Sequence, residues 1–268
     1  MDTSMNKESL KRFATLFILG SVGVLIWGIT QDWTEFEAAA VEAGVSTGTM
    51  AIITILSVHV ILAITVTIGL YCAPRLGFQS VVLNRVSQGK PLVASLKPHA
   101  IPALGIGAIF AVYLLSVELV TPILLEDIGA ERDQTVAFFI NRLPGAVIMG
   151  GITEELLFRW GFMSLVTLVL WKLIGRDRDK PQTWLVWTGI IVAALIFVMS
   201  HLPAVLALYG SSLDIVLFTL LGNAAPAVVF GWIFWRYSIE AAMITHGFAH
   251  FVNIVAIILL ISIGAWPW

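Results

Sequence analysis

Thr153-Glu154-Glu155-Leu156-Leu157-Phe158-Arg159 is the stretch that decides how this chain folds, because it places three charges inside a strongly apolar run. A charged side chain at the centre of a bilayer costs at least about 2.5 kcal/mol, so such charges are rare and usually functional. Of the 268 residues, 59% are hydrophobic and 12% are charged, against about 45–50% and about 25% in soluble domains. The stretch is therefore predicted to lie within a membrane.

The apolar runs along the rest of the chain predict the fold class. They recur at about 20 residues each, the length at which an α-helix crosses a bilayer. They are also continuous, whereas the strands of a membrane barrel alternate apolar and polar residues. We predict an all-α, polytopic membrane protein with seven spanning helices, or eight if the region before Glu154 contains a further short helix. The expected spans are about 13–29, 50–71, 101–125, the segment around Glu154 that ends near Lys172, 184–208, 213–235 and 239–263.

No polar block is large enough to form a separate soluble domain, so the chain is predicted to be one integrated membrane domain. Residues 1–100 would supply two helices and an amphipathic connector, at about 73–100, lying at the membrane interface. Residues 101–268 would supply the remaining helices, which form the core around Glu154. Pro144 and Gly145 are expected to mark the point where an interfacial turn becomes the helix of Glu154.

Basic residues predict the orientation of the chain in the membrane. Short cytoplasmic loops are enriched in Lys and Arg, and a cytoplasmic N-terminus places 12 of the 15 basic residues on the cytoplasmic side. We therefore expect a multi-pass protein of the cell membrane with its N-terminus in the cytoplasm. The net charge of -2 indicates no nucleic-acid partner, and the single cysteine, Cys72, excludes an internal disulfide.

Two of the three charges in this stretch are expected to form an ion pair, which leaves one carboxylate unpaired. Glu155 and Arg159 are four residues apart, so on a helix they share a face and can neutralise each other. Glu154 is rotated by about 100° from Glu155 and is left without that partner. A structural ion-pair network would account for Glu155 and Arg159 but leaves Glu154 unexplained, which makes Glu154 the candidate general base.

Histidines on two further spans are candidate partners of that carboxylate. His246, His250 and Asn253 line one face of the last span, and Phe197 and His201 share a face of the fifth. The histidines fall toward the middle of their spans, so they can meet the free carboxylate in one polar cavity. There the carboxylate would take a proton from water, while His or Asn side chains hold the water, the leaving amine or the oxyanion.

A metal site is the alternative use of the same side chains. Two imidazoles and a carboxylate form a plausible first shell for zinc, so Glu154, His201, His246 and His250 are also candidate ligands of a divalent ion. The His-Glu-x-x-His and Gly-x-Gly-Asp patterns of other intramembrane proteases are absent from the sequence. No cofactor is therefore assigned from the residues alone.

Three short motifs in a fixed order resemble those of the CPBP family of intramembrane proteases, which comprises the type II CAAX prenyl endopeptidases and their bacteriocin-processing relatives. The similarity covers roughly residues 145–255, and each motif lies within an apolar run. The motifs are Glu154-Glu155-x-x-x-Arg159, Phe197-x-x-x-His201 and His246-x-x-x-His250.

The resemblance implies a role for each matched side chain. Glu154 would activate the water, and His201 and His246 would position that water or the substrate carbonyl. Glu155 and Arg159 would support them. The expected activity is hydrolysis of a peptide bond in a membrane-embedded or lipidated peptide, with prenylated CAAX peptides as the best-known substrates of the family.

One position departs from the family pattern. The third motif usually ends in Asn four residues after the histidine, where this chain has His250; Asn253 follows three residues later. Neutral His and Asn can each donate one hydrogen bond to an oxyanion, so we expect His250 to be catalytic, with Phe197 and Asn253 in support. Two other functions are compatible with the same residues, namely a proton- or metal-coupled transporter and a non-catalytic scaffold for membrane peptides.

Overall fold

The computed structural model describes residues 3–89, 91–124, 135–175, 178–209 and 212–267, and these residues form helices and connecting loops without any strand. Seven of the described helices are long and apolar enough to cross a membrane. The predicted all-α class and the count of seven are therefore confirmed. Leu125, the expected end of the third span, lies outside the described residues.

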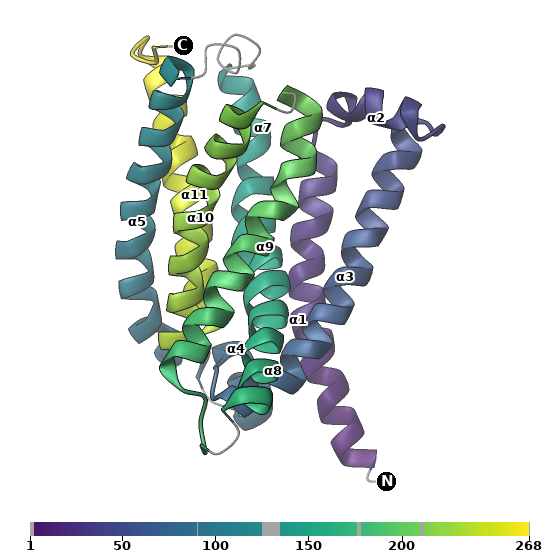
Figure 1. Ribbon diagram of the computed structural model, residues 1–268, viewed down its shortest axis with the longest axis vertical. Helices are drawn as coiled ribbons and strands as arrows, with labels where there is room; N and C mark the ends of the chain where they lie inside the picture. The colour runs from purple at the N-terminus through teal and green to yellow at the C-terminus, as the bar shows by residue number, and fades with distance from the viewer. Residues whose placement is uncertain (1–2, 90, 125–134, 176–177, 210–211, 268) are drawn as a thin grey trace.

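The spanning helices run alternately up and down the bundle, with the two chain ends at opposite ends of the molecule (Figure 1). Short helices occupy the connections: η1 Trp33–Phe36, α2 Glu37–Glu42 and α4 Val81–Gln88. The long elements are α1 Thr3–Thr30, α3 Thr47–Leu76, α5 Leu92–Leu124, α7 Val136–Gly145 with η2 Ala146–Met163 and α8 Ser164–Ile174, α9 Thr183–Tyr209, α10 Leu213–Arg236 and α11 Ile239–Ser262.

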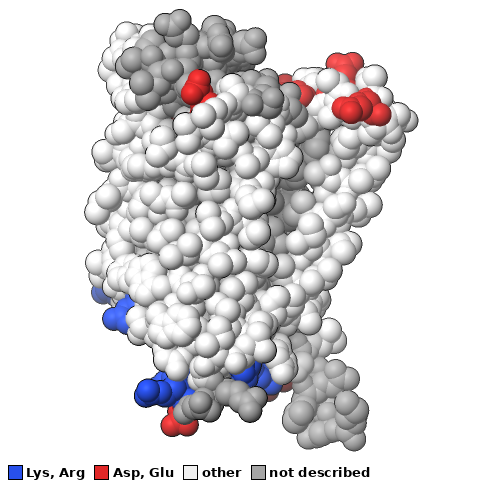
Figure 2. All heavy atoms as spheres, in the orientation of Figure 1, with Lys and Arg blue, Asp and Glu red and all other residues white. Residues whose placement is uncertain are grey.

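On the face shown in Figure 2, charged side chains gather at the two ends of the bundle and leave an uncharged surface between them. Figure 2 shows Lys and Arg at the end where the N-terminus lies and most of the Asp and Glu at the opposite end, including the region of α2. The described residues between the two ends are white in this view, because none of those visible there is charged. A wide apolar surface bounded by charged ends is the surface that a bilayer requires.

The helix that carries the Glu pair is continuous from Val136 to Ile174, over 39 residues. Its N-cap is Thr135, whose Oγ1 accepts a hydrogen bond of 3.2 Å from the backbone N–H of Phe138. The expected turn at Pro144 and Gly145 is therefore wrong, because both residues lie inside the helix. Proline removes one backbone donor, and the helix continues past it as the π-helix η2, in which hydrogen bonds join residues five apart.

Close backbone packing places η2 in the interior of the bundle. A Cβ atom built on Gly151 would lie 2.8 Å from the Cα atom of Gly247 in α11, so only glycine fits at this contact. On another side of η2, the hydroxyl of Thr153 donates a 2.7 Å hydrogen bond to the carbonyl of Gly20 in α1. Together these contacts fix both the depth and the rotation of the segment that contains Glu154.

A buried carboxylate joins the interfacial connector to the last helix. Glu240, in the first turn of α11, accepts hydrogen bonds from Ser80 Oγ (2.6 Å) and from the backbone N–H groups of Val81 (2.8 Å) and Val82 (3.1 Å). A carboxylate is stabilised at a helix N-terminus because it meets unpaired N–H groups and the positive end of the helix dipole. The connector thus contains the short helix α4, anchored against α11. Lys90, also in the connector, lies outside the described residues.

Candidate active site

Glu155 is the centre of a buried polar network that links η2 to α11. Its side chain is 0% exposed, and its Oε1 lies 3.0 Å from Arg159 Nη1 and 2.8 Å from His246 Nδ1. Arg159 also donates a 3.1 Å hydrogen bond from Nη2 to the carbonyl of Ala227 in α10. The pair inferred from the four-residue spacing is therefore present, and the same carboxylate also holds a histidine from another helix.

Two phenylalanines enclose the cation and the histidine of this network. The guanidinium carbon of Arg159 lies 4.7 Å from the ring centroid of Phe197 and 5.5 Å from that of Phe230. The ring of His246 stacks on Phe230, with centroids 4.6 Å apart and an interplanar angle of 27°. Aromatic faces attract cations, and this attraction is stronger where water is excluded. Phe230 was missed in the sequence because nothing distinguishes one more aromatic residue in an apolar helix.

His246 connects the network to a second histidine one turn further along α11. Its side chain is 4% exposed, and its Nε2 lies 3.1 Å from Nε2 of His250. Because the Glu155 carboxylate can only accept, Nδ1 of His246 carries the proton of that contact. In the neutral ring Nε2 is then an acceptor, and the proton between the two rings is assigned to His250.

Glu154 differs from Glu155 in both contacts and exposure. Its side chain is 19% exposed, and its Oε2 lies 4.0 Å from His246 Nε2, a separation too long for a direct hydrogen bond. Among the residues that the structure describes, the Glu154 carboxylate accepts no hydrogen bond. The adjacent carboxylates thus stand in different environments: Glu155 is buried and holds Arg159 and His246 through Oε1, whereas Glu154 is partly exposed and available.

The structure does not join His201 to the other site residues by hydrogen bonds. Its Nδ1 lies 2.8 Å from the carbonyl of Phe197 in the same helix, and its ring packs 4.6 Å from the Phe197 ring. Phe197 is the link to the network, since its ring centroid lies 6.2 Å from that of His246. With Nδ1 donating to the carbonyl, Nε2 of the neutral His201 ring is left as an acceptor.

Asn253 lies in α11, three residues beyond His250, and its side chain is 5% exposed. Its Oδ1 is buried and has no hydrogen-bond partner within the described part of the chain. Buried amide oxygens nearly always have a donor, from protein or from ordered water. An N–H group of a ligand or a water molecule would therefore satisfy this atom.

The four candidate metal ligands are Glu154, His201, His246 and His250. Among the described residues, no group of three or more His, Cys, Asp or Glu side chains is arranged to hold a metal ion. Both ring nitrogens of His246 are already engaged, Nδ1 by Glu155 and Nε2 by His250. The residues as placed do not fit a metal ion.

The sequence also contains a serine-hydrolase pattern, Gly44-Val45-Ser46-Thr47-Gly48. The structure gives Ser46 a different role. Its Oγ accepts a 3.1 Å hydrogen bond from the backbone N–H of Thr49 and thereby caps the start of α3. The flanking turn is exposed at the end of the bundle where α2 lies (Figure 1), so this serine is a helix cap.

The fold and the site together define a multi-pass integral membrane protein with a buried Glu–Arg–His network. Residues 136–252 match the family model described as Type II CAAX prenyl endopeptidase Rce1-like. This part of the chain is a domain of that family, and membership implies intramembrane protease activity. The match includes all three motifs and ends one residue before Asn253. No curated protein and no solved structure matched the chain.

Proposed function

We propose that the chain is an endopeptidase that hydrolyses a peptide bond in a membrane-associated peptide of the prenylated CAAX type, using water activated by Glu154. One observation carries this proposal. Glu155 is committed to Arg159 and His246, whereas the partly exposed carboxylate of Glu154 lies 4.0 Å from His246 Nε2 without a hydrogen bond. A general base has to be near its partners and still free to take a proton.

The 4.0 Å gap between Glu154 Oε2 and His246 Nε2 has the right size for a nucleophilic water. A water molecule about 2.8 Å from each atom makes two ordinary hydrogen bonds. Glu154 takes one proton from this water, and the water oxygen forms the new bond to the substrate carbonyl carbon. Glu154 then returns the proton to the amide nitrogen as the carbon–nitrogen bond breaks.

The neighbouring side chains would hold the water and the developing charge. Glu155 fixes the ring of His246 so that its Nε2 faces both the water and His250, and this nitrogen would accept one hydrogen bond shared between the two donors. The amide of Asn253 would donate a hydrogen bond to the oxyanion, and its unpaired Oδ1 would accept one from the substrate backbone. His201 would accept a hydrogen bond from the N–H of the leaving amine at its free Nε2. No step of this mechanism requires a metal ion.

We further propose that the basic end of the bundle, where the N-terminus lies, faces the cytoplasm. Figure 2 supports this orientation because the visible Lys and Arg side chains gather at that end. Residues 1–100 would act as a scaffold around the catalytic helices of residues 101–268. The packing of α1 and α3 against η2 supports this division, since Thr153 is hydrogen-bonded to Gly20.

The test is incubation of the purified full chain in lipid nanodiscs with matched prenylated and unprenylated peptides, with and without a chelator, read by mass spectrometry. We expect cleavage of the prenylated peptide by the wild type in both conditions and none by Glu154→Gln. Glu42→Gln is the matched control, because Glu42 is exposed on α2, away from the site. Cleavage by Glu154→Gln, or ion flux through the wild type without any cleavage, would contradict the proposal.

A further inference from the structure

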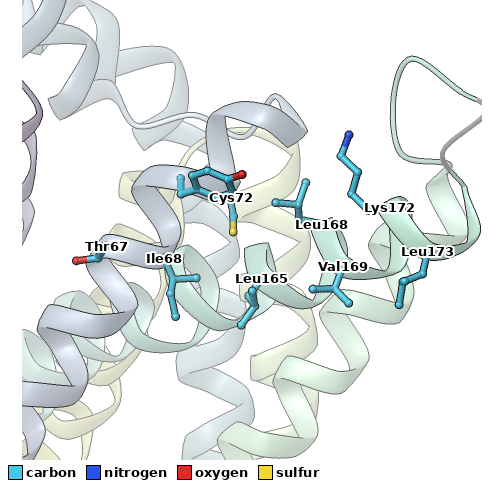
Figure 3. A pocket seen from close by; sticks show the side chains of 9 residues that line it. Thr67, Ile68, Cys72, Leu165, Leu168, Val169, Lys172 and Leu173 are labelled. Carbon is cyan, nitrogen blue, oxygen red and sulfur yellow. The ribbon is translucent and has the colours of Figure 1, made fainter. Parts of the chain in front are cut away.

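A groove of about 570 Å³ lies between α3 and α8, away from the polar network. Its volume falls within the range of about 300–1,000 Å³ that is typical of ligand pockets. Figure 3 shows Ile68 and Cys72 of α3 facing Leu165 and Leu168 of α8, with Lys172 extending beyond them. Most of the side chains that line the groove are apolar, and Thr67, Tyr71 and Lys172 add polar groups.

Tight packing on the catalytic side sets where the groove begins. A Cβ atom built on Gly161 of η2 would lie 2.5 Å from Cβ of Thr65 in α3, so the two helices touch at this level. The groove-lining residues all follow this contact in both helices, toward the basic end. Leu165 lies eleven residues after Glu154 in the sequence, more than two helical turns further along. The groove is therefore separate from the site at Glu154.

The mouth of the groove is cationic and aromatic. Lys172 lies in the last turn of α8 and Arg75 in the last turn of α3. The Lys172 Nζ lies 4.6 Å from the ring of Trp171, and the Arg75 guanidinium carbon lies 3.6 Å from the ring of Tyr71, which lines the groove. Trp and Tyr concentrate at the level of lipid headgroups, so the two cations stand at the depth where phosphates lie.

Neither cation has a protein anion as partner. Across the described residues, no carboxylate forms an ion pair with Lys172 or Arg75. The apolar side chains near the mouth are also open to the surroundings, with Val169 45% and Leu173 74% exposed. An apolar groove that opens toward lipid beside two unpaired cations is complementary to a molecule with a hydrocarbon chain and an anionic head.

We propose that this groove is a binding site for an anionic phospholipid, with one acyl chain between α3 and α8 and the phosphate held by Lys172 and Arg75. Basic pockets between membrane helices bind anionic headgroups because the desolvated phosphate is matched by fixed cations. The lipid enters sideways from the leaflet at the basic end. It supports the packing of α8, which continues directly from the helix of Glu154.

Native mass spectrometry of the purified full chain tests this site with phosphatidylglycerol and phosphatidylcholine of identical acyl chains. The wild type should bind phosphatidylglycerol more tightly. Lys172→Gln should weaken that binding about fivefold, the effect of one basic residue near an anionic headgroup, and leave phosphatidylcholine binding unchanged. Val169→Trp, which fills the groove from its exposed rim, should weaken both. Lys97→Gln is the matched control, an exposed lysine of α5 outside the groove, and should change neither affinity.

Three results would overturn the proposal. The first is equal affinity of the wild type for the two lipids, and the second is an unchanged phosphatidylglycerol affinity in Lys172→Gln. The third is displacement of the bound lipid by a prenylated peptide, because that result would assign the groove to the substrate. Circular dichroism of each variant, compared with the wild type, controls for folding. The readout is lipid mass, so it does not depend on whether the protein cleaves peptides.

Discussion

The Nδ1 atom of His246 lies 2.8 Å from Oε1 of Glu155, and this contact joins the last helix to the helix of the Glu pair. The same oxygen forms an ion pair with Arg159, whose Nη1 lies 3.0 Å away. The second carboxylate of the pair therefore does two things, since it neutralises a buried guanidinium and orients a histidine. Substitutions of the two adjacent glutamates should therefore affect the stability and the activity of the protein differently.

Glu155→Gln is expected to destabilise the protein as well as to reduce its activity. The amide has no charge to balance Arg159, which is fully buried, and breaking a buried ion pair costs about 3–5 kcal/mol. Thermal unfolding followed by circular dichroism measures this effect. Glu154→Gln is the matched comparison, because the Glu154 carboxylate is not the partner of Arg159. Equal unfolding temperatures for wild type and Glu155→Gln would contradict the role of Glu155.

His250→Asn should retain most of the peptide cleavage, whereas His250→Ala should lose it. An asparagine amide can donate to Nε2 of His246 as the His250 ring does now at 3.1 Å, while alanine leaves that nitrogen without its donor. Misplacing a catalytic ring by as little as 1 Å can lower the rate by a factor of about 10². Cleavage rates at saturating substrate measure the difference. If His250→Asn is as inactive as His250→Ala, the hydrogen bond to His246 does not explain the role of His250 in cleavage.

Phe230→Leu should lower both stability and cleavage, although Phe230 is an apolar residue in an apolar helix. The change removes the ring that stacks on His246 and faces Arg159, and a desolvated cation–π contact alone is worth up to about 2 kcal/mol. Phe251→Leu is the control, since Phe251 is 46% exposed on α11 and should tolerate the change. Similar unfolding temperatures for the two variants would show that Phe230 only fills space.

Gly151→Ala should push η2 away from α11 and reduce cleavage. The added Cβ would lie 2.8 Å from Cα of Gly247, a backbone atom that cannot move without moving its helix. Gly105→Ala is the control, because a Cβ at Gly105 has open space around it. The unfolding temperature and the cleavage rate should both fall for Gly151→Ala and stay unchanged for Gly105→Ala. Normal activity of Gly151→Ala would indicate that the helices can separate without disturbing the site.

Sequence patterns predicted the spanning helices because membrane insertion depends on the local run of apolar residues. They also predicted the pairing of Glu155 with Arg159, which depends only on helical spacing. The π-helix after Pro144 could not be predicted, since a proline in an apolar run is compatible with a turn, a kink or a change of hydrogen-bond register.

Contacts between distant segments were also beyond the sequence. Glu240 gave no signal of its contact with α4, about 160 residues earlier in the chain, because such a contact depends on which helix ends meet. His201 was expected to join Glu154 and His246, but its Nδ1 bonds to the carbonyl of Phe197 in its own helix. Side-chain rotamers of this kind are decided by packing and leave no periodic pattern.

The cleavage rate of Glu154→Gln on a membrane peptide tests the central claim most directly. Glutamine keeps the size of the side chain but cannot take a proton from water, and loss of a general base lowers the rate by a factor of about 10²–10⁴. We predict that loss, with an unfolding temperature equal to that of the wild type. Cleavage by Glu154→Gln at the wild-type rate would contradict the assignment of Glu154 as the base.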